Sequence, residues 1–216
     1  MKYAMKRSLL FVIAAVALAA CAPKVEQKTF IYEGNPIVKD KYTADPAPMI
    51  ASDGRLYVFC GHDECFEDRP GYEGKYGFNI TEWLCYSTED MKTWTDHGVV
   101  MKPTDFSWAV GEAWASQAVE GPDGRYYLYY VLDKVDVVSV AVCDTPAGEY
   151  QFYGYVHDET GGTLGERPGD EPQFDPGVLT EGNRTYLYTG FCPKDDPLRH
   201  GPMMTVLKED MLTIAQ

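Results

Sequence analysis

The chain has few basic residues for its length. Its 216 residues include 19 lysines and arginines against 33 aspartates and glutamates, which gives a formal net charge of −14. So acidic a surface argues against nucleic acid and other polyanions as partners, because their phosphates are bound by clustered positive charge. A neutral ligand is more compatible with this balance.

The chain also lacks paired cysteines and metal-ligand spacing. Five of its six cysteines follow Cys21, an odd number without a Cys-x-x-Cys pair, so a disulfide framework is not expected. Cys60, Cys85 and Cys143 stand in apolar strand patterns, where we predict buried free thiols. The four histidines show no zinc spacing and no acidic loop demands calcium, so we expect neither a metal nor a cofactor.

No apolar run is long enough to span a bilayer. The longest, Leu9–Ala20, follows a positively charged start and ends at Cys21, which is typical of a bacterial lipoprotein signal. We expect residues 1–20 to be removed, Cys21 to carry a diacylglycerol, and residues 21–29 to form a lipidated tether. The protein would then sit in the cell envelope, on the inner or outer membrane, facing the periplasm or the surface. It would touch the membrane only through Cys21. An ordinary signal peptide with a chance cysteine is the alternative.

Amphipathic helices are also missing after residue 21, and strand patterns dominate. Three segments each read as a strand, a tight turn with glycine and an aromatic return strand: 45–59, 116–130 and 175–188. Each is followed by a third strand and a polar turn that leads to a fourth strand: 83–94, 138–150 and 203–214. The equivalent residues Arg55, Arg125 and Arg184 keep the units in register. A four-stranded unit repeating in this way is typical of a β-propeller.

The repeat predicts an all-β, incomplete propeller over residues 30–216. Propellers close with about four to eight blades, whereas this chain holds three, and the third ends within its last strand at Gln216. Three blades alone would leave apolar faces and inner edges exposed on blades one and three. A β-sandwich of the same twelve strands is the alternative.

Two aspartates stand at matching places in this repeat. Asp45 and Asp175 each precede a proline at the entry to the first strand of blades one and three. The first strand of each blade lines the propeller axis, so we expect the two carboxylates to converge at one end of it. Blade two has Ser116 near that place. The alternative is that Asp-Pro is only a strand-entry turn.

Three separated motifs resemble glycoside hydrolase family 43. They are Thr43–Pro48, Ala113–Ala115 and Phe174–Val178, and the resemblance extends over essentially all of residues 30–216. Segments 61–64 and 87–94 resemble its arabinofuranosidase and xylosidase branch. The family consists of five-bladed β-propellers that cleave arabinose- or xylose-containing glycans with inversion. The chain would thus be an N-terminal fragment of about three of five blades.

The resemblance implies roles for both acids. Asp45 would be the general base that deprotonates the attacking water. Asp175 would orient the general acid and raise its pKa through like-charge proximity. The general acid itself would be a glutamate from a fourth blade. Within this chain, Glu112, Glu166 and Glu171 are the remaining candidates near the motifs.

The resemblance also implies contacts with a carbohydrate substrate. Trp114, and with it Phe174, would stack on the sugar ring, while His62 and Asp63 would reach its hydroxyls. The alternatives are packing of Trp114 between blades and solvation of the loop that holds His62 and Asp63. Some relatives hold a structural calcium ion on the axis, although nothing in this sequence supports one.

These expectations combine into a functional hypothesis with alternatives. We expect a glycosidase of the α-L-arabinofuranosidase or β-xylosidase type, and we expect residues 1–216 alone to be inactive and poorly soluble. Loss of general acid catalysis alone costs about 10²–10⁴-fold in rate. The alternatives are a non-catalytic glycan-binding lipoprotein, an inactive truncated pseudo-enzyme, or another five-bladed enzyme. Fructan hydrolases fit less well, because Asp45-Pro46 lacks the asparagines that flank this pair in them.

Overall fold

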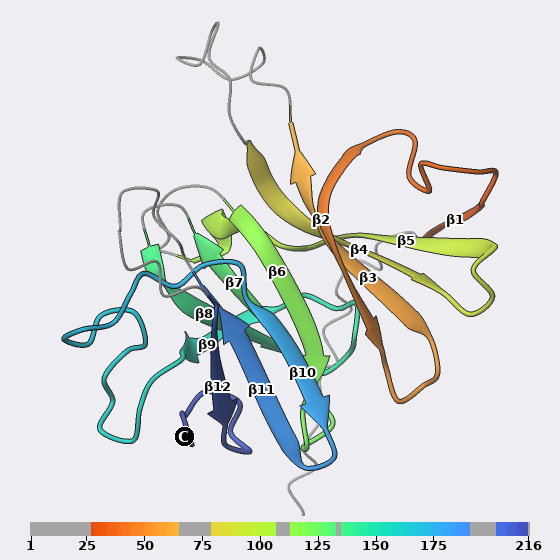
Figure 1. The fold of residues 1–216 in the computed structure, drawn as a ribbon. Helices are drawn as coiled ribbons and strands as arrows, with labels where there is room; N and C mark the ends of the chain where they lie inside the picture. Colours follow the sequence, from red (N-terminus) through yellow and green to blue (C-terminus); the bar gives the residue numbers. More distant parts are fainter. Residues whose placement is uncertain (1–26, 65–78, 107–112, 133–134, 191–201, 216) are drawn as a thin grey trace, which may run out of the picture.

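The computed structural model describes residues 27–64, 79–106, 113–132, 135–190 and 202–215 (Figure 1). Throughout these ranges the chain forms antiparallel strands in three sheets, with one short 3₁₀ turn, η2 (Pro103–Asp105). The all-β prediction is confirmed. Cys21 and the expected signal peptide lie outside the described residues, and no helix among those residues is long and apolar enough to cross a membrane.

Each sheet corresponds to one repeat of the sequence. Blade one contains β1 (Lys28–Ile31), β2 (Tyr42–Ile50), β3 (Leu56–Asp63), β4 (Ile80–Thr88) and β5 (Thr93–Met101), in the order β1-β5-β4-β3-β2. Blade two contains β6 (Ala113–Glu120), β7 (Tyr126–Leu132), β8 (Val135–Cys143) and β9 (Gln151–Tyr155). Blade three contains β10 (Gly177–Glu181), β11 (Arg184–Thr189) and β12 (Met203–Leu207).

Two strands at the sheet edges differ from the four-strand expectation. Blade one gains β1, which pairs with β5 and includes Lys28 and Thr29, two residues that we had placed in the tether. Blade three has three described strands, and a single bridge between Leu207 and Ile214 stands where a fourth strand was expected. Both differences arise in blades one and three, the first and last described blades, each of which packs against only one other described blade.

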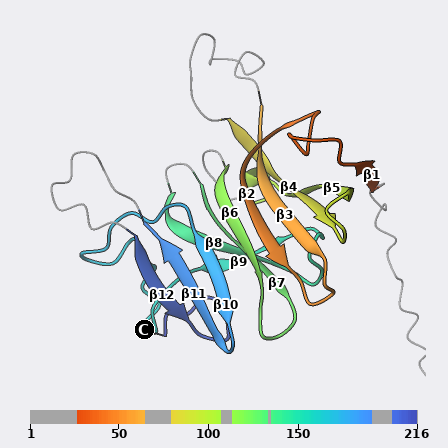
Figure 2. The same ribbon diagram turned by 45° about the vertical axis from the view of Figure 1, so that its right-hand side comes forward.

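The first strands of the blades lie next to one another, as a propeller requires. Strand β6 contacts both β2 and β10, and the two ribbon views show these strands side by side (Figures 1 and 2). The side chain of Gln117 donates from Nε2 to the carbonyl oxygen of Pro48 over 3.1 Å. At the hairpin end, the backbone N–H of Ser52 donates to Glu120 Oε2 over 2.7 Å. These contacts lock blade one against blade two.

The turns repeat in atomic detail. Gly54 and Gly124 adopt φ of 82° and 77° in their Asp-Gly hairpins, a conformation that glycine adopts without steric cost. After the third strands, Asp90 and Asp210 each accept hydrogen bonds from the backbone N–H groups two and three residues ahead, at 2.7–3.0 Å. Residues that the sequence repeat aligns in blades one and three therefore make the same hydrogen bonds in the structure.

The apolar core fills the spaces between blades. Buried side chains between blades one and two include Phe59, Trp83, Leu128 and Tyr130. Those between blades two and three include Tyr129, Val138, Leu187 and Leu207. Both sets lie on facing sides of adjacent sheets, so the blades stack through their faces.

The outer faces of blades one and three differ. Phe30 and Val38 of the N-terminal segment pack on Cys60, Leu84 and Tyr86 and cover part of the outer face of blade one. The side chain of Ile50, which pairs with Leu56 on the same face, is still 76% exposed. On blade three, the outward side chains of Leu179, Tyr188 and Met204 are 51%, 44% and 54% exposed. Exposed apolar side chains are therefore present on the outer faces of both blades, as predicted.

The described cysteines are free thiols. Cys60 and Cys85 are buried as predicted, and burial raises the pKa of Cys60 to about 12. Cys143 is only half-buried, because it stands at the end of β8, where the sheet gives way to a turn. The other two cysteines beyond Cys21, Cys65 and Cys192, lie outside the described residues.

Candidate functional site

The two predicted acids share an unusual backbone conformation. Asp45 and Asp175 have φ of 49° and 45°, a left-handed region that few residues other than glycine adopt. Asp45 lies inside β2, in a bulge between the pairs Ala44–Gly61 and Ala47–Phe59, and not at the strand entry where we expected it. Asp175 lies just before β10. A bulge redirects the side chain that it carries, and strained backbone of this kind clusters at functional sites.

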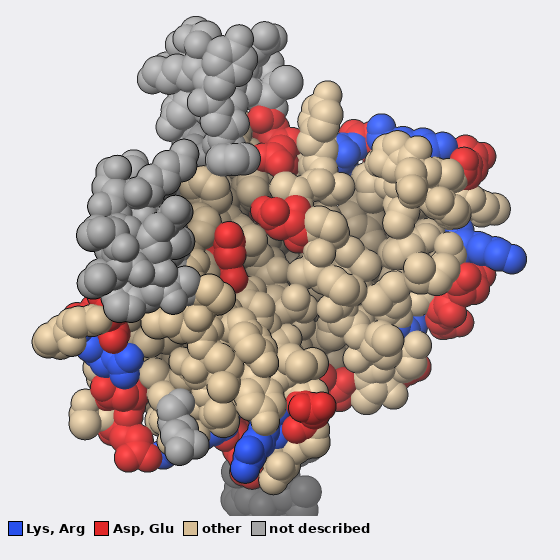
Figure 3. All heavy atoms as spheres, in the orientation of Figure 1, with Lys and Arg blue, Asp and Glu red and all other residues tan. Residues whose placement is uncertain are grey.

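The negative charge of Asp45 acts on Asp175. The pKa of Asp175 is raised, first by partial burial of its carboxyl group and then by this charge. The fold thus brings one carboxylate from blade one and one from blade three to the same region. Figure 3 shows acidic side chains near the ends of β2 and β6 on this face.

A buried glutamine fixes the segment that carries Asp175. Gln173 is fully buried and accepts a hydrogen bond from Thr189 Oγ1 over 2.5 Å. Its Nε2 donates to the carbonyl oxygen of Glu171 over 2.7 Å, and the next residue, Phe174, accepts from the N–H of Gly190. The sequence reasoning missed Gln173, because its partner Thr189 belongs to another strand and no local pattern marks the pair.

The two predicted aromatic residues meet across blades two and three. The rings of Trp114 and Phe174 lie 5.2 Å apart between centroids at 60°, and both are half-buried. Trp114 stands in a bulge of β6, between the paired residues Ala113 and Ser116, at the place where β2 carries Asp45. Fully buried Trp83 donates from Nε1 to the carbonyl oxygen of Trp114 over 2.9 Å and fixes this bulge. Trp114 therefore takes part in packing between blades while part of its ring faces solvent.

Two further charged residues join His62 at the end of blade one. Glu82 accepts from His62 Nδ1 through one oxygen and from Lys102 Nζ through the other, each over 2.8 Å. Burial raises the pKa of Glu82, but the hydrogen bonds from Lys102 and His62 outweigh it and lower the pKa overall. An ionised Glu82 cannot donate a proton, so its role is to hold His62 and Lys102. Predicted Asp63 follows in the same strand and is half-buried.

Neither of the two described candidates for the general acid, Glu166 and Glu171, lies in the first strand of a blade. Glu166 and Glu171 lie in the connection between β9 and β10, where Glu166 is exposed and Glu171 is half-buried. Glu112 lies outside the described residues. Among the described residues, no three histidine, cysteine or acidic side chains are grouped as metal ligands, and the absence of a metal stays a prediction.

Comparison with known protein families confirms the resemblance. The model of "Glycosyl hydrolases family 43" matches residues 33–216. A curated "Xylosidase/arabinosidase" of Thermoclostridium stercorarium is 50% identical over 181 residues, which is 82% of this chain and 36% of that protein. Another, from Bacteroides ovatus, is 35% identical over 119 residues, covering 53% of this chain and 36% of that protein. The chain thus spans about a third of the length of these relatives.

Solved structures agree on the fold. A family 43 β-xylosidase/α-arabinofuranosidase from a compost metagenome, solved with xylotriose, matches with a TM-score of 0.67 at 24% identity. The match covers 88% of this chain and 62% of that one. An α-L-arabinofuranosidase from Clostridium thermocellum matches with a TM-score of 0.58 at 31% identity, covering 84% of this chain and 56% of that one.

Proposed function

This chain belongs to glycosyl hydrolases family 43, and we propose that it supplies the general base of an active site that hydrolyses arabinose- or xylose-containing glycans. The observation that carries the proposal is the meeting of Asp45 and Asp175, each in a left-handed conformation before a proline and each on a different blade. Relatives named xylosidase/arabinosidase support the choice of sugar.

The proposed reaction is inverting hydrolysis. Asp45 takes a proton from a water molecule, whose oxygen attacks the anomeric carbon as the glycosidic C–O bond breaks on the opposite face. The leaving oxygen takes its proton from a general acid that a further blade provides. Asp175 orients that acid, and its negative charge holds the acid's pKa high enough for it to stay protonated. No metal or cofactor is needed for these steps.

The aromatic pair and the His62 cluster bind the sugar in this proposal. The exposed part of Trp114 stacks on the C–H face of the ring, with Phe174 holding it from the side. His62, fixed by Glu82, and neighbouring Asp63 hydrogen-bond to sugar hydroxyls. Preorganised groups of this kind bind at a lower entropic cost than mobile ones.

The test compares leaving groups that do and do not need a proton. Dinitrophenolate departs unassisted, whereas the sugar alcohol of xylobiose must be protonated as it leaves. We expect xylobiose to stay intact. Because the fold brings Asp45 and Asp175 to the same region, we propose slow hydrolysis of dinitrophenyl β-xyloside or the α-arabinofuranoside in place of the complete inactivity expected from the sequence. Asp45→Asn should reduce this slow rate by about 10²–10⁴-fold, the usual worth of a general base. Asp144→Asn, on an exposed turn of blade two, is the matched control.

The outcomes separate the rival functions. NMR of the first-formed sugar should show the anomer of inverted configuration. Binding of xylobiose without any turnover of the dinitrophenyl glycosides would favour a non-catalytic glycan-binding protein. Hydrolysis of xylobiose by this chain would overturn the assignment of the general acid to a further blade.

We also propose that Cys21 anchors the mature protein to the cell envelope. The support is the order of positive charge, apolar run and cysteine at the start of the chain. Cys21→Ser should move the protein from the membrane fraction to the soluble fraction of the envelope. Mass spectrometry of the mature N-terminus should find a diacylglycerol on Cys21. An unmodified cysteine, or a cleavage site elsewhere, would contradict the anchor.

A further inference from the structure

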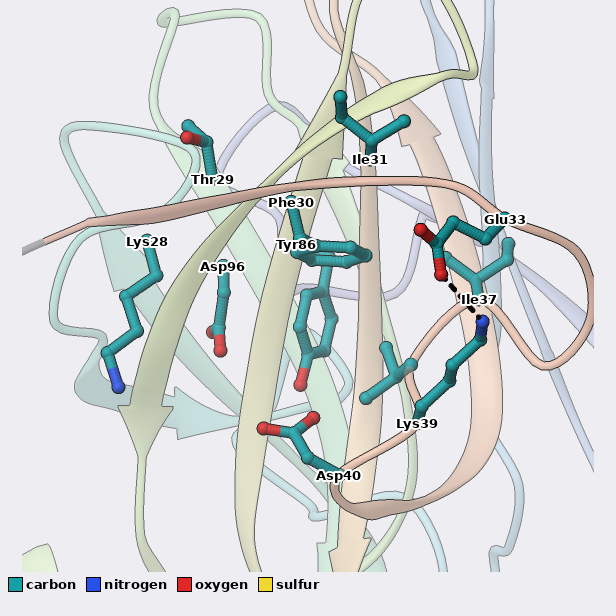
Figure 4. A pocket seen from close by; sticks show the side chains of 11 residues that line it. Lys28, Thr29, Phe30, Ile31, Glu33, Ile37, Lys39, Asp40, Tyr86 and Asp96 are labelled. Carbon is teal, nitrogen blue, oxygen red and sulfur yellow. Dashed lines mark hydrogen bonds and ion pairs between the residues drawn. The ribbon is translucent and has the colours of Figure 1, made fainter.

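A cavity whose lining includes neither Asp45 nor Asp175 lies beneath the N-terminal segment. Strand β1 pairs with β5, and the chain then returns over the outer face of blade one toward β2. The space enclosed between this segment and the sheet is about 440 Å³ and opens to solvent (Figure 4). Its volume falls in the range of about 300–1,000 Å³ that is usual for small-molecule sites.

A buried hydroxyl without a partner points into this cavity. Tyr86 is only 3% exposed, and its Oη makes no hydrogen bond with any described residue. Figure 4 shows the hydroxyl directed away from Phe30 and toward the carboxylate of Asp40. A buried hydroxyl that lacks a hydrogen bond is unfavourable, so a ligand that hydrogen-bonds to it would be stabilised in this cavity.

Polar groups of both signs surround this hydroxyl. Asp96 stands beside it, held by Lys41 Nζ over 3.2 Å, and Asp40 makes no ion pair or hydrogen bond with another described residue. Across the cavity, Lys39 pairs with Glu33 over 3.3 Å. Positive and negative groups nearly balance, so the lining offers donors and acceptors without the strong net charge that a phosphate or a quaternary ammonium group would need.

Apart from Lys28 and Thr29, the remaining lining is apolar. Phe30 packs edge-on against Tyr86, with ring centroids 6.3 Å apart, and Ile37 and Val38 line the same space. A ligand that fits must therefore be neutral, carry hydroxyls on its rim and present C–H groups on a face. Monosaccharide units combine these properties.

We propose that this cavity binds one monosaccharide unit of a neutral glycan, as a site separate from the acid pair. The hydroxyl of Tyr86 and the carboxylate of Asp40 hydrogen-bond to sugar hydroxyls, and Phe30 packs against ring C–H groups. The site holds the glycan to the outer face of blade one and performs no chemistry. It does not depend on the hydrolytic function proposed above.

The test follows two aromatic signals in the full chain by NMR. The ring signals of Phe30 report the cavity and those of Trp114 report the acid pair, so the two sites are observed separately. D-xylose, L-arabinose, xylotriose and maltotriose are the neutral probes, with inorganic phosphate and tetramethylammonium as charged controls. We expect at least one neutral probe to shift the Phe30 signals in a saturable way, and the charged controls to leave them unchanged.

Variants identify the contacts. Tyr86→Phe and Asp40→Asn should each weaken the Kd read from Phe30 by about tenfold, the effect of losing one hydrogen bond to a sugar. Tyr188→Phe, on the outward face of blade three, should leave it unchanged. Because Asp40 is exposed, its variant tests the site even if Tyr86→Phe perturbs the fold. The proposal would be overturned if no neutral probe shifted the Phe30 signals, or if only a charged control shifted them. It would also be overturned if both variants left the Kd unchanged.

Discussion

Removing one oxygen atom should stabilise or destabilise this protein according to which buried tyrosine loses it. Tyr129 is fully buried and its Oη donates to the carbonyl oxygen of Met211 over 2.7 Å, which joins β7 to the turn after β12. Tyr86 is almost as buried, but its Oη has no partner among the described residues. The two sites therefore give a matched pair of Tyr→Phe substitutions.

The expected changes in the free energy of unfolding have different signs. Tyr129→Phe leaves the buried Met211 carbonyl without its donor, which should lower stability by about 1–3 kcal/mol. Tyr86→Phe removes a hydroxyl that is buried without a hydrogen bond, so stability should stay the same or rise by up to about 1–3 kcal/mol. In a chain of this size each kcal/mol moves the Tm by about 2–4 °C.

Urea denaturation followed by circular dichroism measures both changes. The slope m should be the same for both variants and the parent, so that shifts in the midpoint report stability alone. If both variants were destabilised equally, the hydroxyl of Tyr86 would have a partner in the free protein, and the argument for a ligand in its cavity would fail. If neither moved, the turn after β12 would not be held by Tyr129.

Further predictions concern charge and packing. Asp45→Asn should lower the pKa of Asp175 without restoring its ordinary value, because partial burial remains; NMR titration of the carboxyl carbon measures this, and an unchanged pKa would separate the two acids. Hydrogen bonds from its own loop, first from the Thr160 hydroxyl, lower the pKa of Asp158 to about 2. The stability that Asp158 contributes should therefore be complete above the unfolded-state pKa of about 4 and be lost as the pH falls toward 2, and Asp158→Asn should remove that dependence in acid unfolding experiments. Leu187→Ala, at the fully buried contact of blades two and three, should cost about 2–5 kcal/mol in urea denaturation, whereas Leu179→Ala, on the exposed face of the same blade, should cost far less; equal costs would contradict the packing of these blades.

Local chemistry explains why much of the fold was predictable. Asp-Gly turns require a glycine with positive φ, and Gly54 and Gly124 supply it, so hairpin positions could be read directly. A continuous run of aromatic and aliphatic residues such as that of β7 marks a strand buried on both faces. The recurrence of these signals placed Asp45 and Asp175 at equivalent positions before any contact was known.

Long-range pairing decided what the sequence analysis missed. Glu82 binds His62 and Lys102, which are distant in the sequence, and Gln173 accepts a hydrogen bond from Thr189. No local spacing in the sequence therefore revealed Glu82 or Gln173. The position of Asp45 within β2 also differed from expectation, because a bulge depends on the register with β3. Pairing register is set between strands and not within one.

The sequence by itself determined the repeating unit, its turns and the pair of acids, because each rests on residues that are neighbours in the chain. Only the tertiary structure decided that β1 would pair with β5 and that the N-terminal segment would cover part of the outer face of blade one. That pairing joins residues 28–31 to residues 93–96, so it encloses Tyr86 through contacts that no periodicity in the intervening sequence encodes. The positions of Asp45 and Asp175 follow from the repeat, whereas the cavity beneath the N-terminal segment depends on β1, a strand outside the repeat.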